Sequence, residues 1–235
     1  MEKLDKETVA GFFDKRAELY GKIPTLNIAM FQEKQGDLAQ KRNEIEWEAI
    51  WGLLKPEWEG NETVLDIGCG TGRLSFRIAQ VSKGVVGFDV APGLIEICNQ
   101  ERLRRGILNT GFLVRSMDDF RFGRFRLLLI SGVSLYTEDS MWPGIMYCIR
   151  HSCRVGTRIV LRETVGSKGR YELHGAWSEE LGTTYSAIYR DPDWFRALFG
   201  QFCDCLYDEP LLPPSLEKWS ETHQRLMLWK VGNDV

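Results

Sequence analysis

The residues best placed to do chemistry in this sequence lie in the stretch VLDIGCGTGRLS at positions 64–75. Asp66 ends an apolar run, and glycines follow at alternate positions, at Gly68, Gly70 and Gly72. A glycine turn lets the backbone approach a ligand closely, and the helix expected after it begins with unpaired N–H groups. The spacing D-x-G-x-G-x-G differs from the G-x-G-x-x-G of dinucleotide-binding folds. A carboxylate beside the glycines suits a cationic or amino-bearing ligand better than a pyrophosphate.

A second carboxylate, Asp89, ends the next strand-like run at 85–89. Ligands of open parallel sheets bind beyond the carboxyl ends of the strands, near the switch point. An acidic residue at that place can accept hydrogen bonds from both ribose hydroxyls of an adenosine. The alternative is that the glycines only form a turn and that Asp89 caps a helix.

The elements that would position these residues follow from the apolar pattern. Strand-like runs separated by helical stretches occur at 63–67, 85–89, 111–115, 127–131 and 157–162. This alternation predicts a parallel sheet that is covered by helices on both faces. Two further runs, at 202–211 and 224–231, have no helix between them, so we expect them to pair antiparallel at the sheet edge.

Two regions fall outside that alternation. Residues 1–60 are expected to form a helical cap, with Trp47, Ile50, Trp51 and Leu54 on one helix face. Residues 61–235 would form the core, with a substrate insert at about 163–191. This insert is rich in polar aromatic residues and has no clear period, which is typical of a lid or a substrate wall.

The motifs at 64–75 and at 85–98, VVGFDVAPGLIEIC, resemble the first two motifs of the class I S-adenosylmethionine-dependent methyltransferases. The resemblance covers roughly residues 60–165, and the two tail strands fit the same fold. It implies an α/β, Rossmann-like fold with a seven-stranded, mostly parallel sheet of order 3-2-1-4-5-7-6, in which the last strand, strand 7, is antiparallel. It also implies S-adenosyl-L-methionine as the cofactor.

The resemblance assigns cofactor contacts to individual positions. Asp66, Gly68 and Gly70 would line the methionine part, and Asp89 would bind the ribose hydroxyls. In the segment RSMDDF at 115–120, Ser116 stands where the family often has an acidic residue that recognises adenine. The further contacts expected are Met117 and Asp118 near adenine, and Ser131 with Gly132 near the transferring methyl.

The chemistry of methyl transfer needs few protein groups. The reaction is an in-line displacement on an activated carbon, so the protein must mainly align the reacting atoms. A base is needed only if the nucleophile carries a proton at the working pH. His174, in the aromatic insert, is the preferred base candidate, and Tyr136 is a candidate for the wall between cofactor and substrate. Arg162 and Arg190 could hold a carboxylate or phosphate of the acceptor, or instead form ion pairs with neighbouring acidic residues.

The amino-acid composition limits the classes of partner that we expect this chain to bind. The net charge of −3 and the pI near 5.8 argue against a nucleic-acid partner. No run of about 20 apolar residues is present, so we expect no membrane partner. The N-terminus lacks the apolar core of a signal peptide, so a cytoplasmic location is expected. The six cysteines are expected to be reduced and buried, without a metal site. The chain is expected to be a monomer or a homodimer.

The predicted function is methyl transfer from S-adenosylmethionine to an O or N atom of a small molecule that is polar or acidic, with anionic acceptors included. The alternatives are a protein or RNA methyltransferase and a non-catalytic protein that binds S-adenosylmethionine. A nicotinamide-dependent oxidoreductase is disfavoured by Asp66 and by the glycine spacing.

Overall fold

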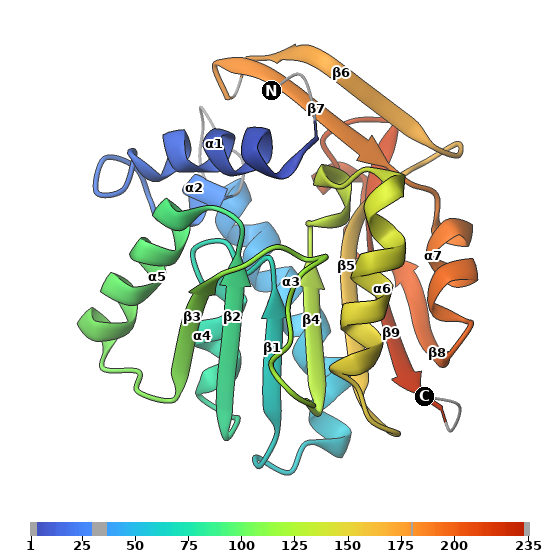
Figure 1. Ribbon diagram of the computed structural model, residues 1–235. Coiled ribbons are helices and arrows are strands. Elements are labelled where there is room, and N and C mark those ends of the chain that lie inside the picture. The colour runs from blue at the N-terminus through green and yellow to red at the C-terminus, as the bar shows by residue number, and fades with distance from the viewer. Residues whose placement is uncertain (1–3, 30–36, 180, 233–235) are drawn as a thin grey trace.

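The computed structural model describes residues 4–29, 37–179 and 181–232. Residues 1–3 and 30–36 of the expected cap and residue 180 of the expected insert therefore lie outside the described part. Within the described part, seven strands form one sheet in the order β3-β2-β1-β4-β5-β9-β8 (Figure 1). The strands are β1 (Thr63–Ile67), β2 (Gly84–Asp89), β3 (Thr110–Val114), β4 (Leu127–Ser131), β5 (Arg158–Gly166), β8 (Cys203–Pro210) and β9 (Thr222–Val231).

The pairing of these strands confirms the predicted architecture. Strands β1 to β5 pair in parallel, and β9 pairs antiparallel with both β5 and β8. In the family's order, β8 and β9 are strands 6 and 7. Parallel pairing brings the carboxyl ends of β1, β2, β4 and β5 to the same edge of the sheet, which is where the predicted site residues lie.

Helices cover both faces of the sheet. The helices of the described residues are α1 (Lys6–Ala17), α2 (Leu26–Ala29), α3 (Leu38–Leu54), α4 (Arg73–Ala79), α5 (Pro92–Arg105), α6 (Trp142–His151) and α7 (Pro192–Phe199). Single turns of 3-10 helix occur at η1 (Lys55–Glu57), η2 (Ser134–Tyr136), η3 (Asp139–Met141) and η4 (Pro214–Leu216). Helices α6 and α7 pack in the core cluster on one face, while α3 and α4 pack in the cluster on the other.

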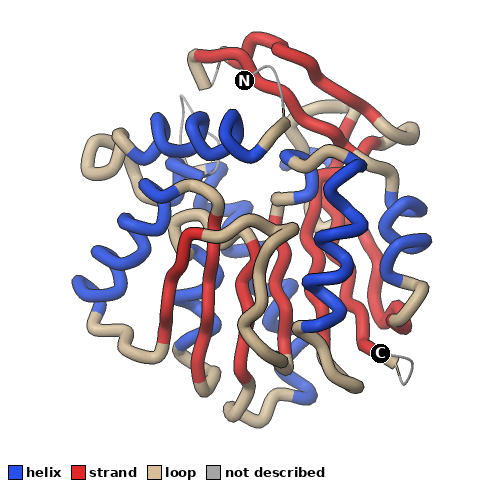
Figure 2. Tube along the Cα trace, viewed as in Figure 1, coloured by secondary structure: helices blue, strands red, loops and turns tan. Residues whose placement is uncertain are grey.

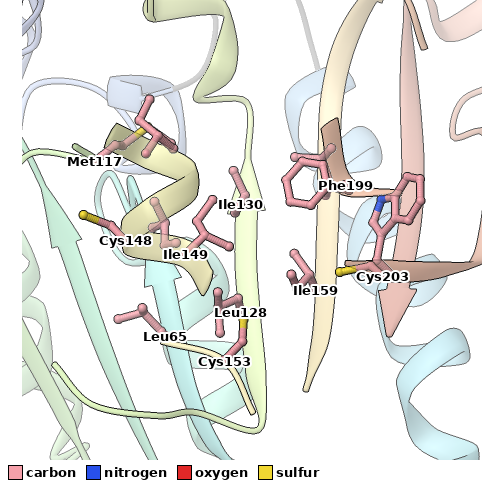
Figure 3. Packing of buried hydrophobic residues seen from close by; sticks show 14 of the residues in the cluster. Leu65, Met117, Leu128, Ile130, Cys148, Ile149, Cys153, Ile159, Phe199 and Cys203 are labelled. Carbon is pink, nitrogen blue, oxygen red and sulfur yellow. The ribbon is translucent and has the colours of Figure 1, made fainter. Parts of the chain in front are cut away.

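Successive strand residues point to opposite faces, so β1 and β4 contribute to both clusters. Leu65, Leu128 and Ile130 face Ile149 of α6, as Figure 3 shows. Val64, Leu127 and Leu129, which alternate with them along the strands, belong to the cluster around α3 and α4. This two-sided burial is the reason that the strands are almost continuously apolar.

The connection from β3 to β4 covers the sheet without a helix. Figure 2 shows it as a loop that crosses in front of the strands. Aromatic rings of this loop cover the sheet face that helices cover at the other strands. The Phe120 ring lies 4.7 Å from the Phe88 ring, centroid to centroid, and Phe125 is buried. This loop begins with the predicted adenine segment, which it holds at the carboxyl end of β3.

The strand ends are covered by α1, by α2 and by a hairpin (Figure 1). The hairpin consists of β6 (Tyr171–Ser178) and β7 (Thr183–Tyr189), a separate antiparallel pair within the expected insert. Helix α3 belongs to the expected N-terminal cap by sequence, but Ile50 and Leu54 pack it on a face of the sheet. Of the region 1–60, it is therefore α1 and α2 that lie over the strand ends.

The cysteines differ from expectation at one position. Five of them are buried, but Cys205 on β8 is exposed. A register shift between Cys205 and Tyr207 interrupts the strand there, at the edge of the sheet. Among the described residues, we find no helix with the length and apolar character needed to span a membrane.

Candidate active site

The glycine turn between β1 and α4 has a backbone that other residues adopt only with strain. Gly68, Gly70 and Gly72 all have positive φ angles, of 68°, 56° and 76°. A Cβ atom on Gly68 would lie 2.5 Å from a methyl carbon of Val133, which follows β4. The turn therefore needs glycine both for its conformation and for space.

Two carboxylates flank this turn. Asp66 is buried and accepts a 2.5 Å hydrogen bond from the Ser75 hydroxyl, and burial raises the pKa of Asp66 to about 6. Asp89 accepts hydrogen bonds of 3.0 Å from the backbone N–H of Gly70 and of Ala91. Burial also raises the pKa of Asp89, in opposition to these backbone hydrogen bonds. The end of β2 is thus tied directly to the turn after β1.

A cavity of about 200 Å³ lies at the carboxyl ends of the strands, beneath α1. It brings together most of the residues that the sequence singled out. The predicted residues in its wall are Asp66, Gly68, Gly70, Asp89, Ser116, Met117, Ser131, Gly132, Tyr136 and Arg162.

Asp118 is absent from this wall. The Ser116 hydroxyl, which does line the cavity, hydrogen-bonds the Asp118 carboxylate, and Lys6 Nζ lies 3.5 Å from the same group. Asp118 is therefore placed to orient Ser116 and the cap rather than to touch a ligand directly.

His174 and Arg190 are likewise not brought to the cavity. The His174 side chain is 72% exposed, and its Nε2 lies 3.0 Å from Glu172 on the same strand. Arg190 is almost completely buried and donates to the carbonyls of Ser134 and Thr137, each at 2.7 Å. It also pairs with Asp139 at 2.6 Å, so its donors brace the segment after β4.

The aromatic part of the wall includes Tyr136. The Phe13 ring of α1 packs edge-on against Tyr136, with centroids 5.1 Å apart, and Tyr185 lies 6.1 Å from Tyr136. Tyr185 and Tyr189 share a hydrogen bond of 3.1 Å between their hydroxyls. Burial raises the pKa of all three tyrosines, so each phenol stays protonated near neutral pH. These hydroxyls can orient a ligand but are poor bases.

Glu46 of α3 is a site residue that the sequence interpretation missed. Its carboxylate is fully buried and accepts a 2.8 Å hydrogen bond from the Ser131 hydroxyl. It lies 2.9 Å from Arg73 and 3.2 Å from Arg162, and all three of these partners line the cavity. Burial acts to raise its pKa, but the two guanidinium groups outweigh that effect and lower the pKa to about 2. Glu46 therefore joins the first turn of α4 to the end of β4 and the middle of β5.

Glu163 is a second buried carboxyl that the interpretation did not assign to the site. Its Oε1 accepts from the backbone N–H of Val133 and Ser134, at 3.2 and 3.1 Å. Burial raises the pKa of Glu163 to about 7. Arg162 and Glu163 are adjacent on β5 and point to opposite faces of the sheet, so Arg162 pairs with Glu46 rather than with Glu163.

The comparisons with known proteins agree with this arrangement. Residues 59–139 match the family described as "Methyltransferase domain". Over 85 residues, or 34% of the chain, the sequence is 46% identical to an aklanonic acid methyltransferase of a Streptomyces species and covers 39% of that protein. Over 113 residues, or 46% of the chain, it is 40% identical to an uncharacterized RNA methyltransferase of Bacillus cereus and covers 24% of that protein.

A solved structure extends the likeness over the whole fold. The phosphoethanolamine N-methyltransferase 1 of Haemonchus contortus, in complex with phosphoethanolamine and S-adenosylhomocysteine, superimposes with a TM-score of 0.72. The alignment covers 98% of this chain and 50% of that protein, at 17% identity. As the motifs predicted, residues 59–139 carry a methyltransferase domain, and the chain folds with the sheet order that the resemblance to the class I S-adenosylmethionine-dependent methyltransferases implied.

Proposed function

We propose that the protein transfers a methyl group from S-adenosylmethionine to an O or N atom of a small polar or acidic molecule. The observation that carries this proposal is the cavity at the strand ends. Its wall contains the glycine turn and Asp89, and it also contains phenol and guanidinium groups from Tyr136 and Arg162. The same cavity thus contains groups that can bind a nucleoside and groups that can bind a methyl acceptor.

The residues present fit the cofactor. A Cβ at Gly68 would overlap Val133, so glycine lets the turn and Val133 pack side by side in the cavity wall that also contains Asp66. In this proposal Asp66, Gly68 and Gly70 hold the methionine part and Asp89 holds the ribose. Ser116 and Met117 contact adenine, with Asp118 behind Ser116.

S-adenosylmethionine supplies an activated methyl carbon, so the protein's task is to align the acceptor and to exclude water. Helix α1 contributes Phe13, which packs on Tyr136 over the strand ends. The Tyr136 hydroxyl stays protonated, so it can donate a hydrogen bond that orients the acceptor atom. A carboxylate acceptor is already deprotonated at neutral pH and needs no base. The position of His174 outside the cavity is compatible with such an acceptor.

The size of the acceptor follows from the cover over the cavity. Helix α1 and the β6–β7 hairpin lie over the strand ends, and their residues Phe12, Phe13 and Tyr185 line the wall. This cover favours a small molecule over a polymer. The similarity to an RNA methyltransferase supports methyl transfer to RNA as the second candidate.

Two measurements test the proposal. Isothermal titration calorimetry should show binding of S-adenosylmethionine and of S-adenosylhomocysteine, whereas binding of NAD without either would contradict the cofactor assignment. A screen of small acids, amines and phenols with S-adenosylmethionine should then yield S-adenosylhomocysteine. Turnover with total RNA and with none of the small molecules would replace the first candidate by the second.

A further inference from the structure

Arg162 is a buried cation whose hydrogen-bonding capacity is only partly used in the described part of the protein. The residue is 7% exposed and lines the cavity. Its Nη2 atom lies 3.2 Å from a carboxylate oxygen of Glu46, and its buried Nε has no hydrogen-bond partner among the described residues. A guanidinium carries five N–H donors, and buried donors without partners cost free energy. This arrangement calls for an acceptor that the polypeptide does not supply.

The neighbouring arginines of the wall are held differently. Arg73 donates to Asn43 Oδ1 and to Glu46 Oε1, both at 2.9 Å. Arg42 donates to the backbone carbonyl of Leu216, with an Nε-to-O distance of 2.8 Å. Protein oxygens thus accept from both of these side chains, and of these three arginines it is Arg162 that keeps a buried N–H without a protein acceptor in the described ranges.

The charge around Arg162 favours an anion. Glu46 is the one carboxylate within ion-pair distance of either Arg73 or Arg162 in the described ranges, so two cations share one anion. Glu217 also lines the cavity, but it accepts from the Gln224 backbone N–H at 2.8 Å, and burial raises its pKa. A ligand carboxylate would balance the remaining positive charge.

The space beside Arg162 is open and polar. A Cβ on Gly132 would lie 3.0 Å from Arg162 Nη1, so the absence of a side chain at this position leaves that nitrogen accessible. Thr164 and Gln224 pair across β5 and β9, and both line the same cavity. Their side chains can donate to an oxyanion held by the guanidinium.

The next part of the wall is aromatic. Phe12 of α1 lies 6.5 Å from Tyr185, and Tyr185 lies 6.1 Å from Tyr136 at an interplanar angle of 86°. Rings at these separations and angles offer both faces and edges to a planar apolar group. The cavity therefore combines one carboxylate-binding side chain with an aromatic wall.

We propose that the methyl acceptor is an aromatic acid and that Arg162 binds its carboxylate. The ring of this acid packs against Phe12, Tyr136 and Tyr185. The inference rests on the proposed function and names its substrate class. A carboxylate can also come from the methionine part of the cofactor, so the experiment must separate these two sources.

The acceptor arm uses protein saturated with S-adenosylhomocysteine. Benzoate and indole-3-acetate, each with its neutral amide, are titrated with saturation-transfer NMR as the readout. Both acids should bind at least tenfold more tightly than their amides, and Arg162→Gln should abolish this preference. Arg162→Lys keeps the charge but lacks the planar fork, so it should recover part of the preference.

Arg158→Gln is the matched control. Arg158 lies four residues earlier on β5, on the same face, is 7% exposed, and contacts Glu62 at 3.9 Å away from the cavity wall. The control should bind the acids as the unmodified protein does, which separates the loss of a ligand contact from the loss of a buried cation. Thermal unfolding of each variant identifies any that fail to fold.

The cofactor arm compares S-adenosylhomocysteine with 5′-methylthioadenosine, which lacks the amino-acid part. Arg162→Gln should leave the ratio of their affinities unchanged. A selective loss of S-adenosylhomocysteine binding would show that Arg162 holds the carboxylate of the cofactor. Equal binding of acids and amides in the acceptor arm would show that Arg162 binds no ligand carboxylate. Either result overturns the inference. If the unmodified protein bound no S-adenosylhomocysteine, the proposed function would fail, and the acids would then be titrated against the protein alone.

Discussion

The carboxylate of Asp89 lies 3.0 Å from the backbone nitrogen of Gly70 and accepts its hydrogen bond. The end of β2 is thereby fastened to the turn that follows β1, although the two residues are 19 positions apart. A second hydrogen bond, from the Ala91 backbone N–H, fixes the other carboxylate oxygen. Asp89 thus stabilises the turn and at the same time lines the cavity.

Replacing Asp89 should weaken cofactor binding. We expect Asp89→Ala to weaken the binding free energy of S-adenosylhomocysteine by about 1–3 kcal/mol. The reason is that the ribose hydroxyls and two backbone amides lose their hydrogen-bond acceptor. Asp89→Asn keeps one side-chain oxygen, so it should fold more stably than the alanine variant and bind with intermediate affinity. Calorimetry and thermal unfolding measure these effects, and an unchanged affinity in both variants would remove Asp89 from the binding site.

Gly68→Ala should distort the cavity wall, because the added methyl must displace Val133. The added methyl would lie 2.5 Å from Val133 Cγ2, and the φ angle of 68° is strained for alanine. We expect a loss of about 1–3 kcal/mol in stability and a fall in S-adenosylhomocysteine affinity of at least tenfold. Gly106→Ala is the matched control, because its φ angle is 66° and no atom lies within 4 Å of the added methyl. An equal effect on binding in both variants would show that close packing of Gly68 against Val133 is not needed to bind S-adenosylhomocysteine.

Glu46 should make stability sensitive to acid. Its pKa of about 2 in the folded protein lies below the ordinary value of 4.5, so its contribution is present above pH 4.5 and is lost as the pH falls toward 2. The shift corresponds to about 3 kcal/mol. Glu46→Gln should therefore lose about 3 kcal/mol of unfolding free energy at pH 7 and show a shallower decline below pH 4.5. Urea denaturation measures both, with Glu48→Gln, an exposed change on the same helix, as the control.

The fold and the part of the cavity wall proposed to hold the cofactor could be predicted, because the sequence patterns that indicate them are local. The apolar runs of β1, β2 and β4 are short and largely buried, and glycines with positive φ mark the turn after β1. Each of these features needs only a few consecutive residues to be recognised. The boundary of β5 was harder, because the strand continues beyond the predicted end at 162 to Gly166, where pairing with β9 rather than apolar periodicity sustains it.

The acceptor side could not be predicted in the same way, because its contacts are long-range. The β6–β7 hairpin is half-buried, and a register shift between Leu173 and Ala176 breaks its alternation of inward and outward residues. Arg190 was expected at the substrate, but Asp139, which is 51 positions away, turns it toward the segment after β4. Glu46 had a usable signal: it lies one helical turn before Ile50, so it continues the apolar face of α3 with a polar residue.

Glu163 should give the opposite pH dependence to Glu46. Its pKa of about 7 in the folded protein exceeds the ordinary 4.5, so the folded state binds more protons than the unfolded state between these values. The unfolding free energy must then fall as the pH rises from about 4.5 to 7, by up to about 3 kcal/mol from this group. Glu163→Gln keeps an oxygen that can accept from Val133 and Ser134 but cannot ionise, so its stability should decline less over this range. Urea denaturation at pH 5, 6, 7 and 8 tests this slope, and parallel curves for the two proteins would show that Glu163 ionises at its ordinary pKa.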